Sequence, residues 1–93
     1  MVTVKFFTLL RLLVKKPSLE VQWEKGDTIG SLLAKTREKA GIDFLHKLVD
    51  DTGELKTGTM ILLNGKNIFH LNKMNTPIED GDTVDLFPPG GGG

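Results

Sequence analysis

The sequence predicts an α+β fold in which one amphipathic helix packs across one face of a mixed β-sheet. Three observations support this prediction. Apolar and polar residues alternate near both ends of the chain, which is the period of a half-buried strand. Residues 28–40 show helical periodicity. A tight-turn signal, Asn64-Gly65, directly follows the apolar stretch Thr59 to Leu63.

Two strands that pair as a hairpin are predicted in the N-terminal part of the chain. Residues 2–8 alternate between apolar and polar side chains and form the first strand. A loop or short helical turn covers Leu9 to Lys16. We expect the next strand to pair with the first, because sequential elements are usually neighbours in space. This second strand follows Pro17-Ser18 and carries apolar side chains at Leu19, Val21 and Trp23.

The main helix is predicted over residues 28–40. Asp27 or Thr28 can accept a hydrogen bond from an unpaired N–H group in the first helical turn. Gly41 suits the left-handed conformation that ends many helices. The residues that recur at helical spacing, and that we expect to face the sheet, are Ile29, Leu32, Leu33, Thr36 and Ala40.

The second half of the chain predicts three further strands. Residues 43–49 form a helical turn, and residues 50–54 form a polar reversal. After the apolar strand that ends at Leu63, the Asn64-Gly65 turn leads into a short strand near Asn67 to Leu71. Thr83 to Phe87 alternates once more and forms the last strand.

This order of elements fits the β-grasp, ubiquitin-like plan. In that plan the first and last strands lie side by side and parallel at the centre of the sheet, and the helix crosses one face. We therefore predict a single β-grasp domain over residues 1–87. A flexible Pro-Pro-Gly-Gly-Gly-Gly tail is predicted over residues 88–93.

Composition argues against several classes of function. A chain of 93 residues, 39% apolar and 26% charged, fits one globular domain. Twelve basic and twelve acidic residues cancel, so we expect no nucleic-acid partner. The absence of cysteine excludes thiolate catalysis and iron–sulfur clusters held by this chain.

The apolar stretch Phe6 to Val14 is too short to span a bilayer, so we expect no membrane partner and a cytoplasmic location. His46 and His70 lack companions at ligand spacing, so no metal site is predicted.

The tail is the strongest candidate for the working part of the molecule. Pro88 and Pro89 stiffen its base and end ladder pairing, because proline fixes φ and lacks an N–H group. Gly90 and Gly91, followed by Gly92-Gly93, have no side chains and can pass where a surface leaves room for backbone only. The six residues span roughly 20 Å when extended. That reach is enough to enter another protein's active site, although a passive flexible end is the alternative.

Three segments of the chain resemble a known family. They are Val4-Lys5-Phe6-Phe7 with Leu10-Arg11, then Ile61 to Gly65, then Pro77 to Pro89 followed by the glycines. The chain resembles the MoaD/ThiS family of ubiquitin-like sulfur carriers. The small subunit of molybdopterin synthase has the more similar ending, strand–Pro–Pro–x–x–Gly–Gly. The likeness runs along nearly the whole chain, with most of its weight at the two ends.

The resemblance implies carrier chemistry, with no catalysis by this chain itself. In the family, a ubiquitin-activating-type adenylating enzyme uses ATP and Mg²⁺ to adenylate the terminal glycine carboxylate, and a sulfur donor then replaces AMP. The product is a thiocarboxylate. Carried over to this sequence, the resemblance implies that Gly93 is the acyl donor and that Gly92 must lack a side chain. No cofactor is expected on the chain. The further partner is the large subunit of a synthase for molybdopterin or tungsten-pterin cofactor, or another sulfur acceptor enzyme.

Two alternative functions would also use an activated tail, and a third alternative would not. A carrier for thiamin-thiazole synthesis would use the same chemistry with another acceptor. A ubiquitin-like modifier would join Gly93 to a lysine of a substrate protein. A plain interaction module of this fold would carry a passive tail, and removal of Gly92-Gly93 would leave its function intact.

A docking surface is predicted near the base of the tail. Successive residues of a strand point to opposite faces, so Phe7 and Phe87 should lie on the face away from the helix. Exposed phenylalanine beside a mobile terminus suits a binding surface. A covering loop through Leu10 or Phe69 is the alternative. With Arg11, Phe7 and Phe87 are the predicted partner-binding residues. The residues expected to face the helix are Val4, Phe6, Val84 and Leu86.

Overall fold

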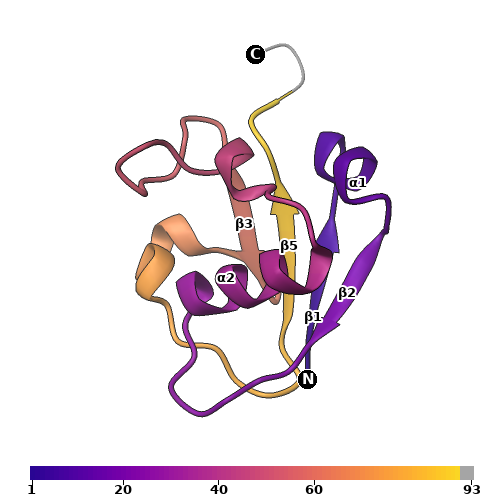
Figure 1. Cartoon of the computed structure of the whole chain (residues 1–93). Coiled ribbons are helices and arrows are strands. Elements are labelled where there is room, and N and C mark those ends of the chain that lie inside the picture. Colours follow the sequence, from indigo (N-terminus) through magenta and orange to yellow (C-terminus); the bar gives the residue numbers. More distant parts are fainter. Residues whose placement is uncertain (91–93) are drawn as a thin grey trace.

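The computed structural model describes residues 1–90, and within them a sheet and a set of helices form two layers (Figure 1). The 3₁₀ helices are η1 (Leu45–Lys47), η2 (Ile68–His70) and η3 (Lys73–Asn75). The α-helices and strands, in chain order, are β1 (Val2–Phe6), α1 (Leu9–Val14), β2 (Ser18–Val21), α2 (Ile29–Ala40), β3 (Met60–Leu63), β4 (Lys66–Asn67) and β5 (Thr83–Phe87).

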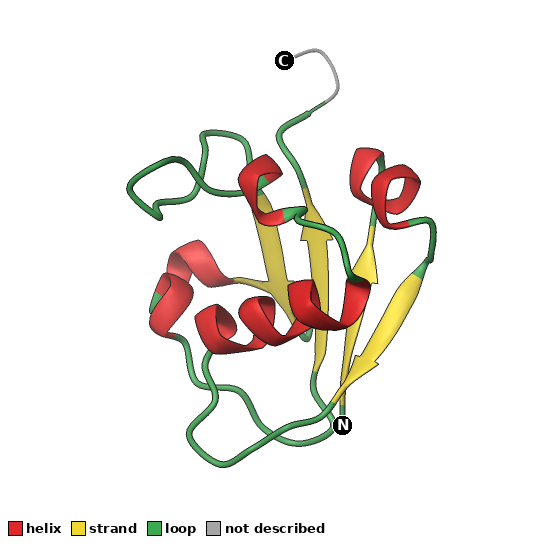
Figure 2. Ribbon diagram, viewed as in Figure 1, coloured by secondary structure: helices red, strands yellow, loops and turns green. Residues whose placement is uncertain are grey.

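The strand order β2-β1-β5-β3-β4 confirms the predicted β-grasp, ubiquitin-like plan. β1 and β5 are parallel neighbours, with Val4 opposite Val84 and Phe6 opposite Leu86. The other pairings, β1 with β2, β3 with β4 and β3 with β5, are antiparallel. Figure 2 shows α2 crossing one face of the sheet. We call the opposite face of the sheet the outer face.

The core lies between α2 and the sheet. The residues predicted to face the helix, Val4, Phe6, Val84 and Leu86, are all at most 1% exposed. Phe6 also meets Phe44 edge to face, with ring centroids 5.4 Å apart. Burial of these side chains is the main favourable contribution to folding. The α2 residues in the core are Ile29, Leu32 and Leu33.

Helix α2 has the predicted caps at both ends. The Thr28 side chain accepts a hydrogen bond from the N–H of Ser31, and the Ser31 hydroxyl accepts one from the N–H of Thr28. At the other end Gly41 adopts φ +72°, and its N–H donates to the carbonyl of Arg37. The predicted helix over residues 28–40 is confirmed.

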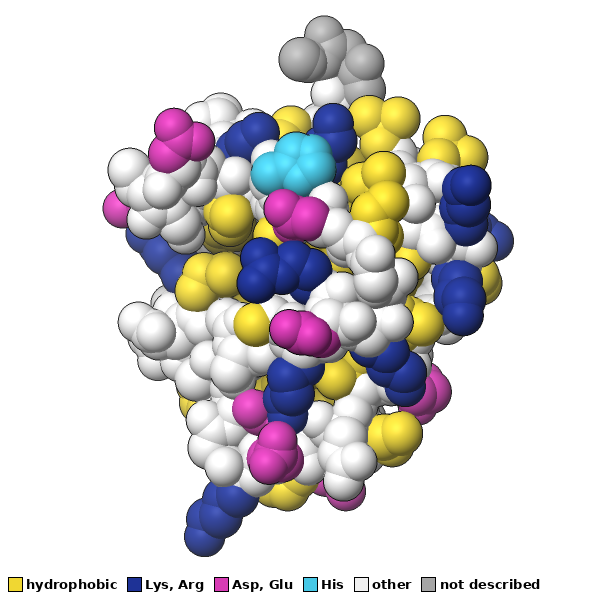
Figure 3. All heavy atoms as spheres, in the orientation of Figure 1, with side chains coloured by type: hydrophobic (Ala, Val, Ile, Leu, Met, Phe, Trp, Pro, Cys, Tyr) yellow, Lys and Arg dark blue, Asp and Glu magenta, His cyan; other side chains and the backbone are white. Residues whose placement is uncertain are grey.

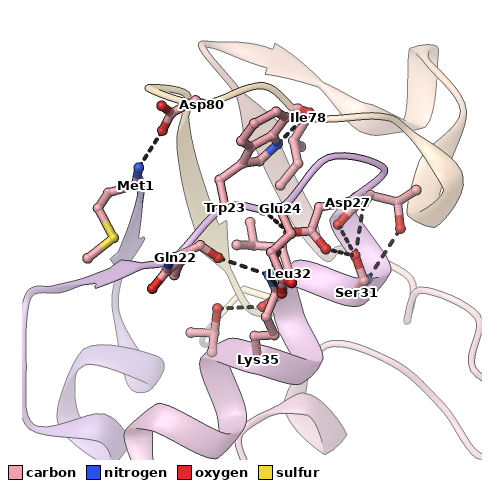
Figure 4. Close-up of polar contacts among 12 residues, drawn as sticks. Met1, Gln22, Trp23, Glu24, Asp27, Ser31, Leu32, Lys35, Ile78 and Asp80 are labelled. Atoms are coloured by element: carbon pink, nitrogen blue, oxygen red, sulfur yellow. Dashed lines mark hydrogen bonds and ion pairs between the residues drawn. The ribbon is translucent and has the colours of Figure 1, made fainter.

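The ends of the first two strands differ from the prediction. β1 stops at Phe6, two residues early, because the chain turns at Thr8, whose φ is +51°, and enters α1. β2 stops at Val21 and excludes Trp23, whose indole N–H donates to the carbonyl of Ile78 at 2.9 Å (Figure 4). In this position Trp23 joins the segment after β2 to the loop before β5.

The predicted short strand over residues 67–71 is wrong beyond its first residue. β4 contains only Lys66–Asn67, and the chain then enters η2. The Asn67 side chain causes this change, since its Oδ1 accepts a hydrogen bond from the N–H of Phe69 at 2.9 Å and caps a helical turn. The turn before β4 is as predicted, with positive φ at both Asn64 and Gly65.

A polar cluster ties the loop after β2 to α2 (Figure 4). Asp27 is 9% exposed and accepts hydrogen bonds from Lys35 Nζ at 2.6 Å, from Ser31 Oγ at 2.9 Å and from the N–H of Glu24 at 2.9 Å. Burial alone raises the pKa of Asp27, but these three donors outweigh it and hold that pKa below its ordinary value of 3.8. The hydrogen bond to Asp27 raises the pKa of Lys35, against the opposing effect of burial.

This cluster predicts a loss of stability in acid. The pKa of Asp27 is lower in the folded than in the unfolded state, so its contribution is complete above about pH 4 and disappears as pH falls through the folded pKa. The pKa of Lys35 is raised by folding, so its contribution disappears only in alkali, as pH rises through the folded pKa. Asp27→Ala should cost about 2–3 kcal/mol at neutral pH and reduce the slope of stability against pH in acid.

Urea unfolding of the wild type and of Asp27→Ala, repeated at several pH values, measures both effects. Glu24→Ala is the control, because the Glu24 carboxylate is 75% exposed and its ion pair with Lys35 should contribute less than about 1 kcal/mol. If the free energy of unfolding falls equally steeply in acid for Asp27→Ala and for the wild type, Asp27 is not the source of the acid sensitivity.

Candidate functional site

The tail begins from a rigid base. β5, the strand between β1 and β3, leads directly into Pro88, which is buried, and Pro89, which is half-buried. Gly90 is exposed. In Figure 1 the chain after β5 leaves the sheet between α1 and the loop that precedes β3. Gly91, Gly92 and Gly93 lie outside the described residues.

Gly58 lies directly beside this base. Met60 pairs with Phe87 in the antiparallel ladder of β3 and β5, and two further steps of the same register place Gly58 opposite Pro89. A Cβ atom added to Gly58 would lie 3.5 Å from both Cα and Cβ of Pro89. Gly58 also adopts φ +91°, which favours glycine. The backbone at Gly58 therefore forms one wall of the path by which the tail leaves the sheet.

The segment around Gly58 is attached to the core. Leu48 is fully buried, and its carbonyl accepts hydrogen bonds from the N–H of Lys56 at 2.8 Å and from Thr59 Oγ1 at 3.0 Å. The N–H of Thr59 donates to the carbonyl of Lys56 at 3.0 Å. These bonds hold the residues on either side of Gly58, so the wall beside Pro89 is fixed relative to the sheet.

The two predicted partner-binding phenylalanines lie against each other on the outer face. The rings of Phe7 and Phe87 are stacked, with centroids 4.4 Å apart and planes 11° apart. Both are half-buried. Met60, which is 37% exposed, is the cross-strand partner of Phe87. We call Phe7, Met60 and Phe87 the outer patch. Pro88 follows Phe87 directly, so the outer patch adjoins the base of the tail.

The two residues considered as a cover for this patch lie elsewhere. Leu10 is fully buried in the core. Phe69 is 60% exposed, and its ring contacts His70 and the ammonium group of Lys73, which is 4.8 Å from the ring centroid. The Phe69 ring makes no aromatic pair with the stacked rings of Phe7 and Phe87.

Arg11 lies on α1, which is at the end of the molecule where the chain leaves β5 (Figure 1). It is exposed, and it lines a shallow surface hollow with Leu12, Lys15, Lys16 and Pro17. Leu12 is 72% exposed. The hollow therefore combines positive charge with exposed apolar surface. We retain Arg11 as a predicted partner-binding residue on this basis.

Comparison with known proteins identifies the family. The model of the ThiS family matches residues 4–93, which is almost the whole chain. The chain belongs to the ThiS family. This result confirms the resemblance to sulfur carriers inferred from the sequence.

Relatives of this ThiS-family protein are named as modifiers and carriers rather than as enzymes. It is 33% identical to small archaeal modifier protein 3 of Haloferax volcanii, over 97% of this chain and 96% of that one. It is 31% identical to an Archaeoglobus fulgidus protein named "Putative sulfur carrier protein", over 86% of this chain and 89% of that one. CysO of Mycobacterium tuberculosis has a similar crystal structure, with TM-score 0.82, 26% identity, and coverage of 97% and 100%. The ThiS-family chain is thus a ubiquitin-like protein of the carrier and modifier class.

Sequence reasoning missed two residues near the site of this ThiS-family protein. One is Gly58, whose role depends on the register of β3 and β5. The other is Asp85, a carboxylate on the outer face of a strand with neighbours on both sides. The alternation in Thr83 to Phe87 was a signal for Asp85, since it assigns Asp85 to the same face as Phe87.

Residues 1–90 of the ThiS-family chain contain neither a cluster of metal ligands nor a membrane-spanning helix. No group of three or more His, Asp or Glu side chains in this range could hold a metal ion. His46 Nδ1 lies 3.8 Å from Asp43 Oδ2, and both side chains are more than half exposed. In the same range, no helix has both the length and the apolar character needed to cross a bilayer. Basic and acidic side chains are interspersed on the face shown in Figure 3.

Proposed function

We propose that this protein is a sulfur carrier whose Gly93 carboxylate is adenylated in trans and converted to a thiocarboxylate. The observation that supports this proposal best is how the tail is held at its described base, residues 88–90. A central strand, buried Pro88 and the fixed wall at Gly58 hold its base, and the outer patch adjoins it. A partner that binds the outer patch would receive the glycines at a defined place on its own surface.

The chemistry explains why a second protein is needed. A carboxylate is a poor electrophile, so it must first attack the α-phosphate of ATP, which releases pyrophosphate and leaves an acyl-adenylate. A sulfur donor then displaces AMP. ATP, Mg²⁺ and the reacting carbonyl have to meet in an enclosed site that holds them in position. We assign ATP and Mg²⁺ to the adenylating enzyme, and we place the reaction in the cytoplasm because it consumes ATP.

The proposed acceptor is the pterin precursor of a molybdenum or tungsten cofactor, reached through the large subunit of a synthase. This choice is supported by the Phe87-Pro88-Pro89 ending that the chain shares with the small subunit of molybdopterin synthase. A thiazole synthase is the alternative acceptor. Thiocarboxylated protein supplied to each purified acceptor enzyme separates the two, because only the correct one forms its sulfur-containing product.

Mass spectrometry tests the carrier chemistry. The full-length protein is incubated with the adenylating enzyme of the same organism, ATP, Mg²⁺ and a sulfur donor. The intact mass should rise by the difference between sulfur and oxygen, and omission of ATP should abolish the change. A chain that lacks Gly92-Gly93 is the control. An unchanged mass, with an enzyme that adenylates another carrier in parallel, would contradict the proposal.

Conjugation to protein lysines is a second candidate, favoured by the similarity to a protein named as an archaeal modifier. The same acyl-adenylate serves both functions, so the conjugates themselves must be detected. No lysine or arginine follows Lys73, so trypsin would leave a long remnant, residues 74–93, on each target lysine. A protease that cleaves before aspartate would leave Asp85 to Gly93. If this remnant is absent from protein lysines in cells grown under several stresses, sulfur transfer alone is favoured.

The outer patch predicts a loss of affinity when Phe87 is replaced. Phe87→Ser removes about 0.5–1.5 kcal/mol of ring stacking, together with the smaller apolar burial of a half-buried ring. Because Phe87 is proposed as a central contact, the substitution should also weaken binding by about 2 kcal/mol or more, roughly thirtyfold in Kd. Calorimetric titration with the adenylating enzyme measures Kd, and urea unfolding measures stability. Phe69→Ser is the control, because Phe69 is exposed but lies outside the outer patch. Lost stability with unchanged affinity would reverse the assignment.

A further inference from the structure

Asp85 lies in the middle of the outer face. It is opposite Lys5 of β1 and opposite Leu62 of β3, so a neighbouring strand flanks it on each side within the sheet. Phe87 is two residues further along β5 and therefore points to the same face. The carboxylate is thus a close neighbour of the outer patch and lies on the strand that leads into the tail.

One oxygen of this carboxylate has no hydrogen-bond donor. Among the residues that the structure describes, Asp85 Oδ1 is the one buried side-chain oxygen or nitrogen without a partner. A buried acceptor without a donor raises the free energy of the folded protein, and such groups are rare in native structures. Asp85 therefore does not stabilise the isolated domain through this oxygen, and another reason for the carboxylate is required.

The nearest basic residue in the register does not supply the missing donor. Lys5 is exposed, and none of the ion pairs among residues 1–90 joins it to Asp85. By contrast, Glu20 on the same face does have an internal donor, since it accepts a hydrogen bond from Thr3 Oγ1 at 2.7 Å. Asp85 differs from Glu20 in this respect, although both are carboxylates on the outer face; Glu20 lies on β2, with β1 between it and β5.

We infer that Asp85 is the polar anchor of the outer face and accepts a hydrogen bond from an arginine or lysine side chain of the adenylating enzyme. This inference rests on the proposed function. The neighbouring side chains are exposed or half-buried, so their ends can move aside for a donor. A cation surrounded by the apolar groups of the outer patch forms a strong, directional bond, because water is excluded from it. The anchor thereby selects a partner with a positive charge beside an apolar contact.

The test compares two alanine variants of the full chain. Asp85→Ala should have an unfolding midpoint in urea equal to or above that of the wild type, because it removes an unpaired acceptor. Its Kd for the purified adenylating enzyme of the same organism should be at least about tenfold higher. Glu20→Ala should show the opposite pattern, with slightly lower stability and an unchanged Kd. Asp85→Asn should bind with an intermediate Kd that depends less on salt than the wild-type Kd.

Each other result has a distinct meaning. A clearly lower urea midpoint for Asp85→Ala would show that the carboxylate has a donor within the chain, and this overturns the inference. Retained stability with an unchanged Kd overturns it too. Self-association that is lost in Asp85→Ala would assign the anchor to a second copy of the chain. Failure of the wild type itself to bind the enzyme contradicts the proposed function and the choice of partner together.

Discussion

Gly92→Val should reduce formation of the acyl-adenylate at least about a hundredfold while leaving the unfolding midpoint unchanged. Gly92 is the residue next to the reacting carbonyl, and the proposed function requires it to enter an enclosed site as bare backbone. A β-branched side chain has bulk on both sides of Cβ and restricts the backbone angles. A misplacement of about 1 Å at the reacting centre can cost a hundredfold in rate. Pyrophosphate release by the adenylating enzyme measures the effect.

The control for Gly92→Val is Gly90→Val. Gly90 is exposed, and a Cβ atom added to it meets nothing within 4 Å. The ending strand–Pro–Pro–x–x–Gly–Gly, which the tail of this chain resembles, leaves the residue at this point unspecified, so Gly90→Val should retain most of the activity. An equal loss in the two variants would mean that tail flexibility, and not its width near the end, controls the reaction.

Phe6→Ala should destabilise the fold by about 3–5 kcal/mol. Phe6 is 1% exposed, meets Phe44 edge to face and lies opposite Leu86 across the parallel pair of β1 and β5. Its removal leaves a cavity in the middle of the core. The loss is a large part of the 5–15 kcal/mol that is typical of a small domain. Chemical unfolding at low temperature measures the loss.

Phe7→Ala is the natural comparison for Phe6→Ala, because the two residues are adjacent and lie on opposite faces of the sheet. Phe7 is half-buried and stacked on Phe87. Its replacement should cost less stability than that of Phe6 and more affinity for the adenylating enzyme. If Phe7→Ala is the more destabilising of the two, or if it leaves affinity unchanged, the outer patch is a structural feature and no docking surface.

Most of the fold could be predicted because local patterns and the fold plan agree. The alternation in Val2 to Phe6 and in Thr83 to Phe87, together with the caps of α2, is local information that survives in the structure. The strand expected at residues 67–71 failed because one side chain, Asn67, offers the backbone a cap that competes with ladder pairing. A pattern of apolar residues cannot reveal that competition.

The residues that make up the candidate site could be predicted from the sequence, but the residues that surround them in neighbouring strands could not. The glycines, the prolines and the pair Phe7 and Phe87 could be recognised from residue type and strand period. The roles of Gly58 and Asp85 depend on which residues stand opposite them in neighbouring strands. Such pairings join residues about 20 to 80 positions apart along this chain, and the alternation of side chains gives the face on which a residue lies but not the residue opposite it.

Intact mass spectrometry of the protein purified from its own cells is the decisive test for a thiocarboxylate at Gly93. We predict that a fraction of the native protein has one oxygen of the Gly93 carboxylate replaced by sulfur, located in that residue by fragmentation. Two results would contradict it. One is native protein that permanently carries further residues after Gly93. The other is full cellular function of a chain whose final carboxylate is blocked as an amide.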